Sequence, residues 1–329
     1  MLHTKTKEYL QNSKNLLAFS GGGDSSALFF ILQENHIPFD IAIVDYGVRQ
    51  QSKEEVAYAL NLARKYGIRC YVKRAEPIEQ NFEANARNIR YNFFEQLIEQ
   101  HRYENLISAH HLGDRLEWFL MQLSKGAGCV ELSGMQEMEQ RENYTLVRPL
   151  LHLTKQHLLN YLDQHNYRYF EDATNKETTF KRNYFREKFS EPLLAEFGEG
   201  IARSFRYIDR DNAMLVQKTA VKKCNKLAYF ASKNPRSDLV TLDRYLKGLL
   251  HVMRASEKEQ FLQNKSVVIG RRYIATVCGA YVFVAPYIVA SSMPKKLKER
   301  LRMLKINPKL RGYLAGDAEA VELLSLLLA

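Results

Sequence analysis

Paired cysteines are missing from this sequence of 329 residues. The chain has four cysteines, which are widely separated and form no CxxC pair: Cys70, Cys129, Cys224 and Cys278. Zinc and iron–sulfur sites that are built from such pairs are therefore not expected. Isolated thiols suit a reducing compartment, and we expect a cytoplasmic protein.

Long apolar runs are also missing. Residues 1–15 are polar and lack the apolar core of a signal peptide. The apolar run at 321–328 is too short to span a bilayer. We therefore expect no association with a membrane.

Acidic residues are fewer than basic ones. The chain has 48 Lys and Arg residues against 37 Asp and Glu residues, which gives a formal net charge of +11. This excess favours a polyanionic partner. With 46% hydrophobic and 26% charged residues, the composition is that of an ordinary globular protein, and the length suggests about two domains.

The most informative segment is a glycine-rich turn between an expected strand at 16–19 and an expected helix at 25–35. It reads Ser20-Gly21-Gly22-Gly23-Asp24-Ser25. Glycines let a ligand approach the backbone, and the N–H groups of such a turn and of the following helix favour an anion. The segment lacks the lysine of GxxxxGK[ST]. A flexible loop or plain helix caps would explain the glycines or the polar residues, but not both directly after a buried strand.

Strands and helices alternate through the first part of the chain. Strands are expected at 16–19, 39–44, 68–72, 106–109 and 145–147. Helices are expected at 25–35, at 81–101, at 114–124, and from a Ser52-x-x-Glu55 capping box to Gly67. This alternation predicts an α/β fold with a doubly wound parallel sheet. Ligands of such sheets bind beyond the carboxyl ends of the strands, where Ser20, Asp45 and His110 are expected.

The pattern changes beyond about residue 193. Helical spacing continues over 197–226, and short β-rich runs follow at 267–269, 273–277 and 281–284. They predict a smaller, mainly helical domain with a β-hairpin or meander. We place the division at residue 200, so the predicted domains are 1–200 and 201–329.

Two further segments carry candidate site residues. Arg87 and Arg90 lie one turn apart on the expected helix 81–101, where they could meet a phosphate or a carboxylate. The alternative is a solvated helix face. His110 and Asp114 are four residues apart at a strand-to-helix turn, so both could approach one ligand. The alternative is a buried histidine and an aspartate that caps the helix.

A third segment joins a loop with Asp172 and Asn175 to a helix that carries Arg182 and Arg186 on one face. Together, the segments resemble the tRNA(Ile)-lysidine synthetase family of PP-loop ATP pyrophosphatases over most of residues 16–192. In that family's notation they read SGGxDS at 20–25, a VDHGLR-like segment at 44–49, NxEAxAR…RY at 81–91, AHHxxD at 109–114, RPLL at 148–151 and D..N…RN..R at 172–186. Each segment is moderately specific, but their order and spacing are highly specific.

Two positions depart from the family pattern. Gly113 precedes Asp114, so one carboxylate stands where family members often have adjacent acidic residues. Tyr46 replaces the usual histidine after Asp45, so no role is transferred to it.

The resemblance implies an ATP-binding catalytic domain at 1–200 and a tRNA-binding domain at 201–329. Its reaction adenylates the C2 oxygen of the wobble cytidine in tRNA(Ile) with a CAU anticodon, releases pyrophosphate, and lets free L-lysine displace AMP to form lysidine. It implies ATP binding by Ser20, Gly21, Gly22, Gly23, Asp24 and Ser25, catalysis by Asp24, His110, Asp114 and Arg186, and substrate or phosphate contacts by Arg87, Arg90 and Arg182. Mg²⁺ would be bound by Asp24 and Asp114; the latter has the alternative role of receiving a proton from lysine.

The segment 293–311 has eight basic residues and one acidic residue, with leucines at helical spacing. It loosely resembles the family's C-terminal basic segment, which implies tRNA contacts by Lys295, Lys296 and Lys298; the alternative is a solvated amphipathic helix. Alternatives for the whole chain are another PP-loop enzyme, such as a tRNA thiolase or a nucleotide amidotransferase, and an inactive tRNA-binding protein. The number of subunits stays open, a homodimer included.

Overall fold

The computed structural model describes residues 1–47, 51–78, 80–171, 181–289 and 292–328. The chain forms two compact units, Met1–Asp209 and Arg210–Ala329. The helix α9 (Glu191–Leu215) passes from the first unit into the second, and residue 200 lies inside it. None of the helices in the described ranges has the length and apolar character that crossing a membrane would need.

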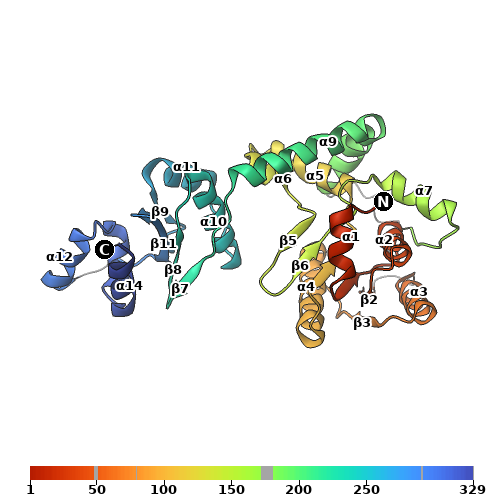
Figure 1. The fold of residues 1–329 in the computed structure, drawn as a ribbon, viewed down its shortest axis with the longest axis horizontal. Coiled ribbons are helices and arrows are strands. Elements are labelled where there is room, and N and C mark those ends of the chain that lie inside the picture. The colour runs from red at the N-terminus through yellow and green to blue at the C-terminus, as the bar shows by residue number, and fades with distance from the viewer. Residues whose placement is uncertain (48–50, 79, 172–180, 290–291, 329) are drawn as a thin grey trace. The chain divides into compact units, whose positions relative to one another are not determined.

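A six-stranded sheet forms the centre of the first unit, in the order β3-β2-β1-β4-β6-β5 (Figure 1). Its strands are β1 (Asn15–Ala18), β2 (Phe39–Asp45), β3 (Cys70–Arg74), β4 (Asn105–Ile107), β5 (Met138–Gln140) and β6 (Thr145–Val147). Five strands are parallel, and only β5 pairs antiparallel, with β6. The predicted doubly wound sheet is therefore confirmed. The short edge strand β5 was missed because it is largely exposed and has no apolar alternation.

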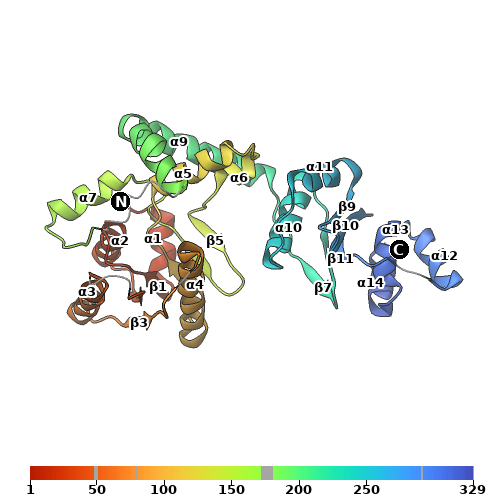
Figure 2. The same ribbon diagram turned by 180° about the vertical axis from the view of Figure 1, so that it is seen from behind.

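Helices cover both faces of this sheet (Figure 2). Alternate residues of a strand point to opposite faces. Leu17 and Ile41 pack with the cluster that includes α2 (Gly23–Glu34) and α3 (Gln51–Tyr66), whereas Leu16 packs with α4 (Phe82–His101). The remaining helices of the unit are α1 (Thr4–Gln11), α5 (Leu112–Leu123), α6 (Cys129–Ser133), α7 (Lys155–Gln164) and α8 (Lys181–Phe185), followed by a π-helical turn at Arg186–Ser190.

The strand order reverses between β1 and β4. Strands β2 and β3 lie on one side of β1 in the sheet, and β4 and β6 lie on its other side. In parallel sheets, ligands bind in a crevice beyond the carboxyl ends of the strands at such a reversal point. The glycine turn follows β1 and the two histidines at 110–111 follow β4, which brings both segments to this crevice.

Several predicted boundaries were wrong. The helix α3 begins at Gln51, so Ser52 lies inside it and does not cap it. Strand β3 begins at Cys70, two residues later than predicted, and α5 begins at Leu112, ahead of the predicted Asp114. Phe82, the first residue of α4, and Leu123, the last residue of α5, are 46% and 52% exposed.

The second unit is built on a five-stranded antiparallel sheet of order β7-β8-β11-β10-β9. The strands are β7 (Lys222–Cys224), β8 (Leu227–Ala231), β9 (Ser266–Ile269), β10 (Tyr273–Cys278) and β11 (Tyr281–Pro286). The predicted meander β9–β10–β11 is confirmed. The helix predicted over 197–226 ends at Leu215, however, because residues 222–224 of that range form β7, which pairs with β8.

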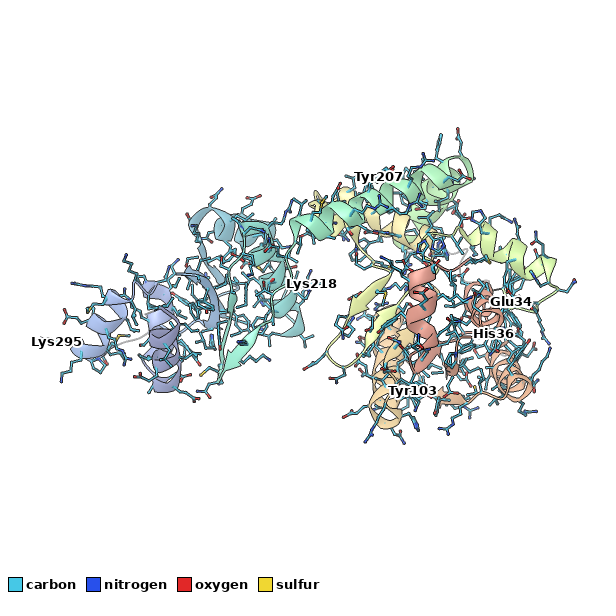
Figure 3. All side chains as sticks on the ribbon, viewed as in Figure 1. Glu34, His36, Tyr103, Tyr207, Lys218 and Lys295 are labelled. Carbon is cyan, nitrogen blue, oxygen red and sulfur yellow. The ribbon has the colours of Figure 1, made fainter. Side chains whose placement is uncertain are left out.

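Helices pack on both faces of the second sheet. One cluster contains α10 (Pro235–Gly248) and α11 (Ala255–Asn264), and the other contains α12 (Lys295–Met303), α13 (Pro308–Leu314) and α14 (Ala318–Leu328). In α12, Leu301 is buried. Lys295, at the start of α12, is labelled in Figure 3; it is exposed, as are Lys296 and Lys298.

Candidate active site

The glycine turn is held in a fixed shape. Gly21 has a φ of +79°, a conformation that favours glycine, and its carbonyl oxygen accepts a hydrogen bond from the Phe170 N–H at 3.0 Å. The Ser25 hydroxyl lies 3.0 Å from that of Ser20 and donates to the Gly22 carbonyl at 3.1 Å. The N–H groups in the first turn of α2 have no partners within the helix. This arrangement suits an anion.

Asp24 lies in this first turn. Its Oδ2 is 3.8 Å from Nε2 of His111, and its Oδ1 is buried without a hydrogen-bond partner among the described residues. Burial raises the pKa of Asp24, against the opposing effects of His111 and Lys155. Mg²⁺ prefers carboxylate oxygens and shares them with phosphates and water. The unpartnered oxygen of Asp24 therefore fits a magnesium–phosphate complex.

The chain enters α5 through two histidines, of which the sequence singled out only His110. The ring of His110 lies 2.9 Å from the Ser108 hydroxyl, and burial lowers its pKa to about 4, so it is neutral at pH 7. His111 is the N-cap of α5, and its Nδ1 accepts from the Gly113 N–H at 3.0 Å. Its Nε2 faces both Asp24 and Asp114, at 3.8 and 3.7 Å. Its position between strand and helix was the signal that could have identified it.

Asp114 is buried and both of its oxygens accept hydrogen bonds. Oδ2 accepts from the His111 backbone N–H at 3.0 Å, and Oδ1 accepts from Arg182 Nη2 at 2.6 Å. Burial alone would raise its pKa, but the histidines and Arg182 hold the pKa of Asp114 well below its usual range. Asp114 is therefore ionised, and its oxygens are already engaged.

Mg²⁺ therefore fits Asp24 better than Asp114. No group of three or more potential ligands among His, Cys, Asp and Glu could hold a metal ion within the described residues. An ion at Asp24 would take its other oxygens from substrate phosphates and water.

Glu117 joins the two predicted arginines and was missed from the sequence. Its carboxylate is 1% exposed. Arg182 Nε donates to it at 2.8 Å, and Arg186 donates from Nε at 2.5 Å and from Nη2 at 3.2 Å. Arg182 and Arg186, which were predicted to share a helix face, thus both contact Glu117, a buried acid one turn beyond Asp114. A buried carboxylate needs such partners, which hold both guanidiniums beside Asp114.

The remaining candidates are distributed around this centre. Arg87 is exposed and lies over the Tyr91 ring at 4.7 Å; its charge contributes to the lowered pKa of His110. Arg90 is also exposed, on the next turn of α4. The buried Asp45 accepts from the Gly47 N–H at 2.8 Å and lies 3.7 Å from Arg74.

The structure thus brings together Asp24, His111, Asp114, Glu117, Arg182 and Arg186, with His110 beside them. The predicted loop residues Asp172 and Asn175 lie outside the described residues.

Both departures from the family pattern have local explanations. A Cβ at Gly113 would lie 2.7 Å from Cε1 of His111, so another residue there would displace the imidazole. The Tyr46 hydroxyl donates to the Ala86 carbonyl at 3.0 Å, which ties the end of β2 to α4.

A glycine turn and an acidic residue at the reversal point of a parallel sheet define an ATP-binding domain of the PP-loop class. A sequence model of the PP-loop domain matches residues 2–193. In fold, the chain is similar to the U34-tRNA thiolase NcsA from Methanococcus maripaludis, with a TM-score of 0.50 and 16% identity over 62% of this chain and 78% of that chain.

Relatives in sequence extend over both units. The chain is 42% identical over 314 residues to the tRNA(Ile)-lysidine synthase of Helicobacter pylori, which covers 94% of this chain and 92% of that protein. It is 42% identical over 315 residues to the enzyme of the same name from Wolinella succinogenes, which covers 95% of this chain and 96% of that protein. The chain belongs to the tRNA(Ile)-lysidine synthase family.

Proposed function

We propose that this protein is an ATP-dependent ligase that joins lysine to the wobble cytidine of tRNA(Ile) with a CAU anticodon. The observation that carries the proposal is the glycine turn with Asp24 at the reversal point of the sheet. The chain that carries this turn is related over 94% of its length to a tRNA(Ile)-lysidine synthase. We propose a cytoplasmic location, because the proposed substrate is a tRNA.

The reaction has two steps. The C2 oxygen of cytidine attacks the α-phosphorus of ATP, and the bond to pyrophosphate breaks. The amine of lysine then attacks C2, AMP leaves with the oxygen, and the amine loses a proton. Adenylation is needed because C2 carries a poor leaving group until AMP is attached.

We assign the residues of the site different roles in these two steps. The N–H groups around Ser20–Ser25 would hold the phosphates of ATP, and Asp24 would hold Mg²⁺, which neutralises charge on the leaving pyrophosphate. Arg182 and Arg186 would stabilise the negative charge that develops during adenylation. Asp114 keeps Arg182 and the start of α5 in place, and the neutral imidazole of His110 is a candidate acceptor for the lysine proton.

The direct test is incorporation of labelled lysine into a tRNA(Ile) transcript with a CAU anticodon. We expect incorporation only with ATP, with one pyrophosphate released for each lysine attached. A transcript with uridine at the wobble position is the matched control and should accept no lysine. ATP-independent labelling, or pyrophosphate release without labelling, would contradict the proposal.

Arg186→Lys tests the predicted contact with phosphate. Lysine keeps the charge but loses the planar fork that binds Glu117 and a phosphate together. We expect the rate of adenylation to fall by about 10- to 100-fold, with the Kd for tRNA changed less than threefold. Pyrophosphate release in a single turnover and filter binding measure the two quantities. Equal losses in both would indicate a contact with tRNA alone.

The three lysines of α12 are proposed to contact tRNA. Lys295, Lys296 and Lys298 are exposed, whereas Leu301 anchors the helix in the second unit. Neutralising phosphates releases counterions, so we expect the triple change to Glu to raise the KM for tRNA at least about tenfold and to flatten its salt dependence. The KM values for ATP and lysine should stay unchanged. An unaltered tRNA KM would remove this helix from the RNA-binding surface.

A further inference from the structure

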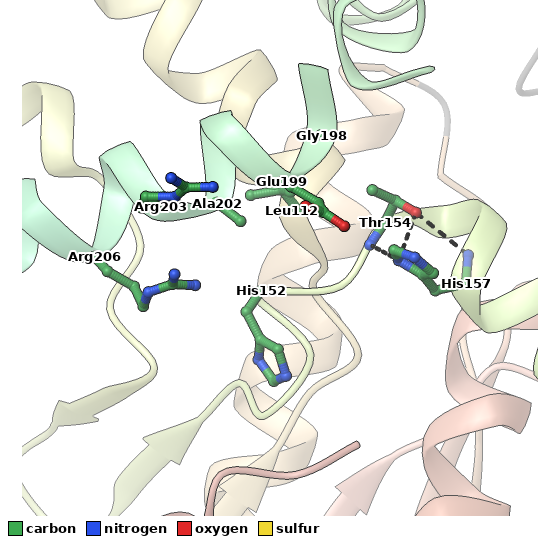
Figure 4. A pocket seen from close by; sticks show the side chains of 9 residues that line it. All are labelled: Leu112, His152, Thr154, His157, Gly198, Glu199, Ala202, Arg203 and Arg206. Carbon is green, nitrogen blue, oxygen red and sulfur yellow. Dashed lines mark hydrogen bonds between the residues drawn. The ribbon is translucent and has the colours of Figure 1, made fainter. Parts of the chain in front are cut away.

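A pocket of about 260 Å³ lies in the first unit (Figure 4). Three segments form it: the helix α9, the chain from the end of β6 into α7, and the first residue of α5. Its lining residues are Leu112, His152, Thr154, His157, Gly198, Glu199, Ala202, Arg203 and Arg206. None of them was predicted as a site residue.

The pocket is lined by two arginines that have no ion-pair partner among the described residues. Arg203 and Arg206 lie one turn apart on α9, are exposed, and form no ion pair with a residue that the structure describes. Arg182 and Arg186, in contrast, are bound to the buried Glu117. The one acidic residue of the lining is Glu199, so the pocket has a net positive charge.

The two histidines supply polar groups. Burial lowers the pKa of His152 to about 4, so its ring is neutral at pH 7; its Nε2 lies 2.9 Å from the Met1 carbonyl oxygen. Nδ1 of His157 lies 2.9 Å from the Thr154 hydroxyl. The lining has no Phe, Tyr or Trp ring on which a nucleotide base could stack. A pair of arginine forks with polar neighbours suits the oxygens of a phosphodiester better than a base.

Two lining residues of the pocket are adjacent in the sequence to residues that act on Asp24 of the proposed ATP site. Leu112 directly follows His111, whose ring faces Asp24, and Thr154 directly precedes Lys155, whose charge acts on Asp24. The glycine turn already provides the donors for the phosphates of ATP. A second phosphate-binding surface next to it is therefore available to another phosphate-bearing substrate.

We propose that Arg203 and Arg206 bind backbone phosphates of the tRNA and hold it on the catalytic unit. This inference rests on the proposed function for the identity of the RNA. The binding itself does not require lysidine formation. It adds an RNA contact on α9 to the one proposed for the lysines of α12.

The test uses the full chain with Arg203→Gln and Arg206→Gln combined. Each lost phosphate contact removes about one unit from the slope of log K against log salt. We expect the double variant to raise the Kd for tRNA at least about tenfold near physiological salt and to lower that slope by about two. Filter binding over a salt series measures both, and the Kd of a fluorescent ATP analogue should stay within twofold.

The matched control removes two exposed charges elsewhere in the same unit, with Arg64→Gln and Lys65→Gln at the end of α3. It should leave the tRNA Kd and the slope nearly unchanged. Arg203→Lys with Arg206→Lys keeps both charges and should retain most of the slope. If the Gln variant lowers the melting temperature, the salt dependence of the Lys variant tests the proposal instead. A slope of log K against log salt that falls as far in the Lys variant as in the Gln variant would overturn the proposal.

An unchanged tRNA Kd and slope in a folded Gln variant would also overturn it, and a raised Kd for ATP alone would assign the pocket to the nucleotide. Because binding is measured without turnover, the two proposals can fail separately. A wild-type protein that binds tRNA through this pocket but attaches no lysine would overturn only the proposed function.

Discussion

Asp24→Asn is expected to lower the rate of pyrophosphate release by at least about 1,000-fold while leaving the fold intact. The substitution keeps the size of the side chain and removes its charge. Oδ1 of Asp24 has no hydrogen-bond partner among the described residues, and burial raises the pKa of this carboxyl, so no contact that the structure describes depends on that oxygen. Loss of the charge removes the proposed ligand of Mg²⁺ and the charge that faces His111 at 3.8 Å, but no side-chain volume from the core.

Thermal unfolding and tRNA binding provide the controls for Asp24→Asn. The melting temperature should not fall, because the ionised carboxylate is itself disfavoured by burial. The Kd for tRNA should stay within about threefold of the wild-type value. Wild-type turnover in the folded variant would exclude Asp24 from the mechanism. Loss of binding of both ATP and tRNA, with a lower melting temperature, would indicate a structural role instead.

Asp114→Asn is expected to reduce both activity and stability. Asp114 accepts from Arg182 and from the backbone N–H that begins α5, and both bonds favour its ionised form. Breaking such a buried pair leaves Arg182 with Glu117 as its remaining partner and costs about 2–4 kcal/mol in the free energy of unfolding. We also expect at least a ~100-fold lower rate, since Arg182 and His111 would lose their positions. Denaturant unfolding and single-turnover kinetics measure the two effects.

His110→Gln distinguishes the role of His110 from that of Asp114. The ring of His110 is neutral at pH 7, so glutamine removes a proton acceptor without removing a charge. We expect at least a ~100-fold loss of rate with a change of less than about 1 kcal/mol in the free energy of unfolding. A normal rate in the folded fraction, with a lower melting temperature, would show that His110 is a structural residue.

The sequence by itself determined the features that depend on residues close together in the chain. Three glycines with flanking Ser and Asp predict a turn that suits an anion. The apolar strands β1 and β2 and the largely apolar helix α2 between them could be identified because their burial follows from local patterns. The order of the motifs was enough to identify the family.

The tertiary structure decided which charges meet. Glu117 belongs to a helix whose sequence shows an ordinary acid on an amphipathic pattern, and only the packing of α8 and the π-helical turn on α5 surrounds it with Arg182 and Arg186. In the same way, His111 gained its place between two carboxylates because β1 and β4 became neighbours in the sheet. The contacts of Glu117 with the two arginines and of His111 with Asp24 join residues that are far apart in the sequence, so no local periodicity predicts them.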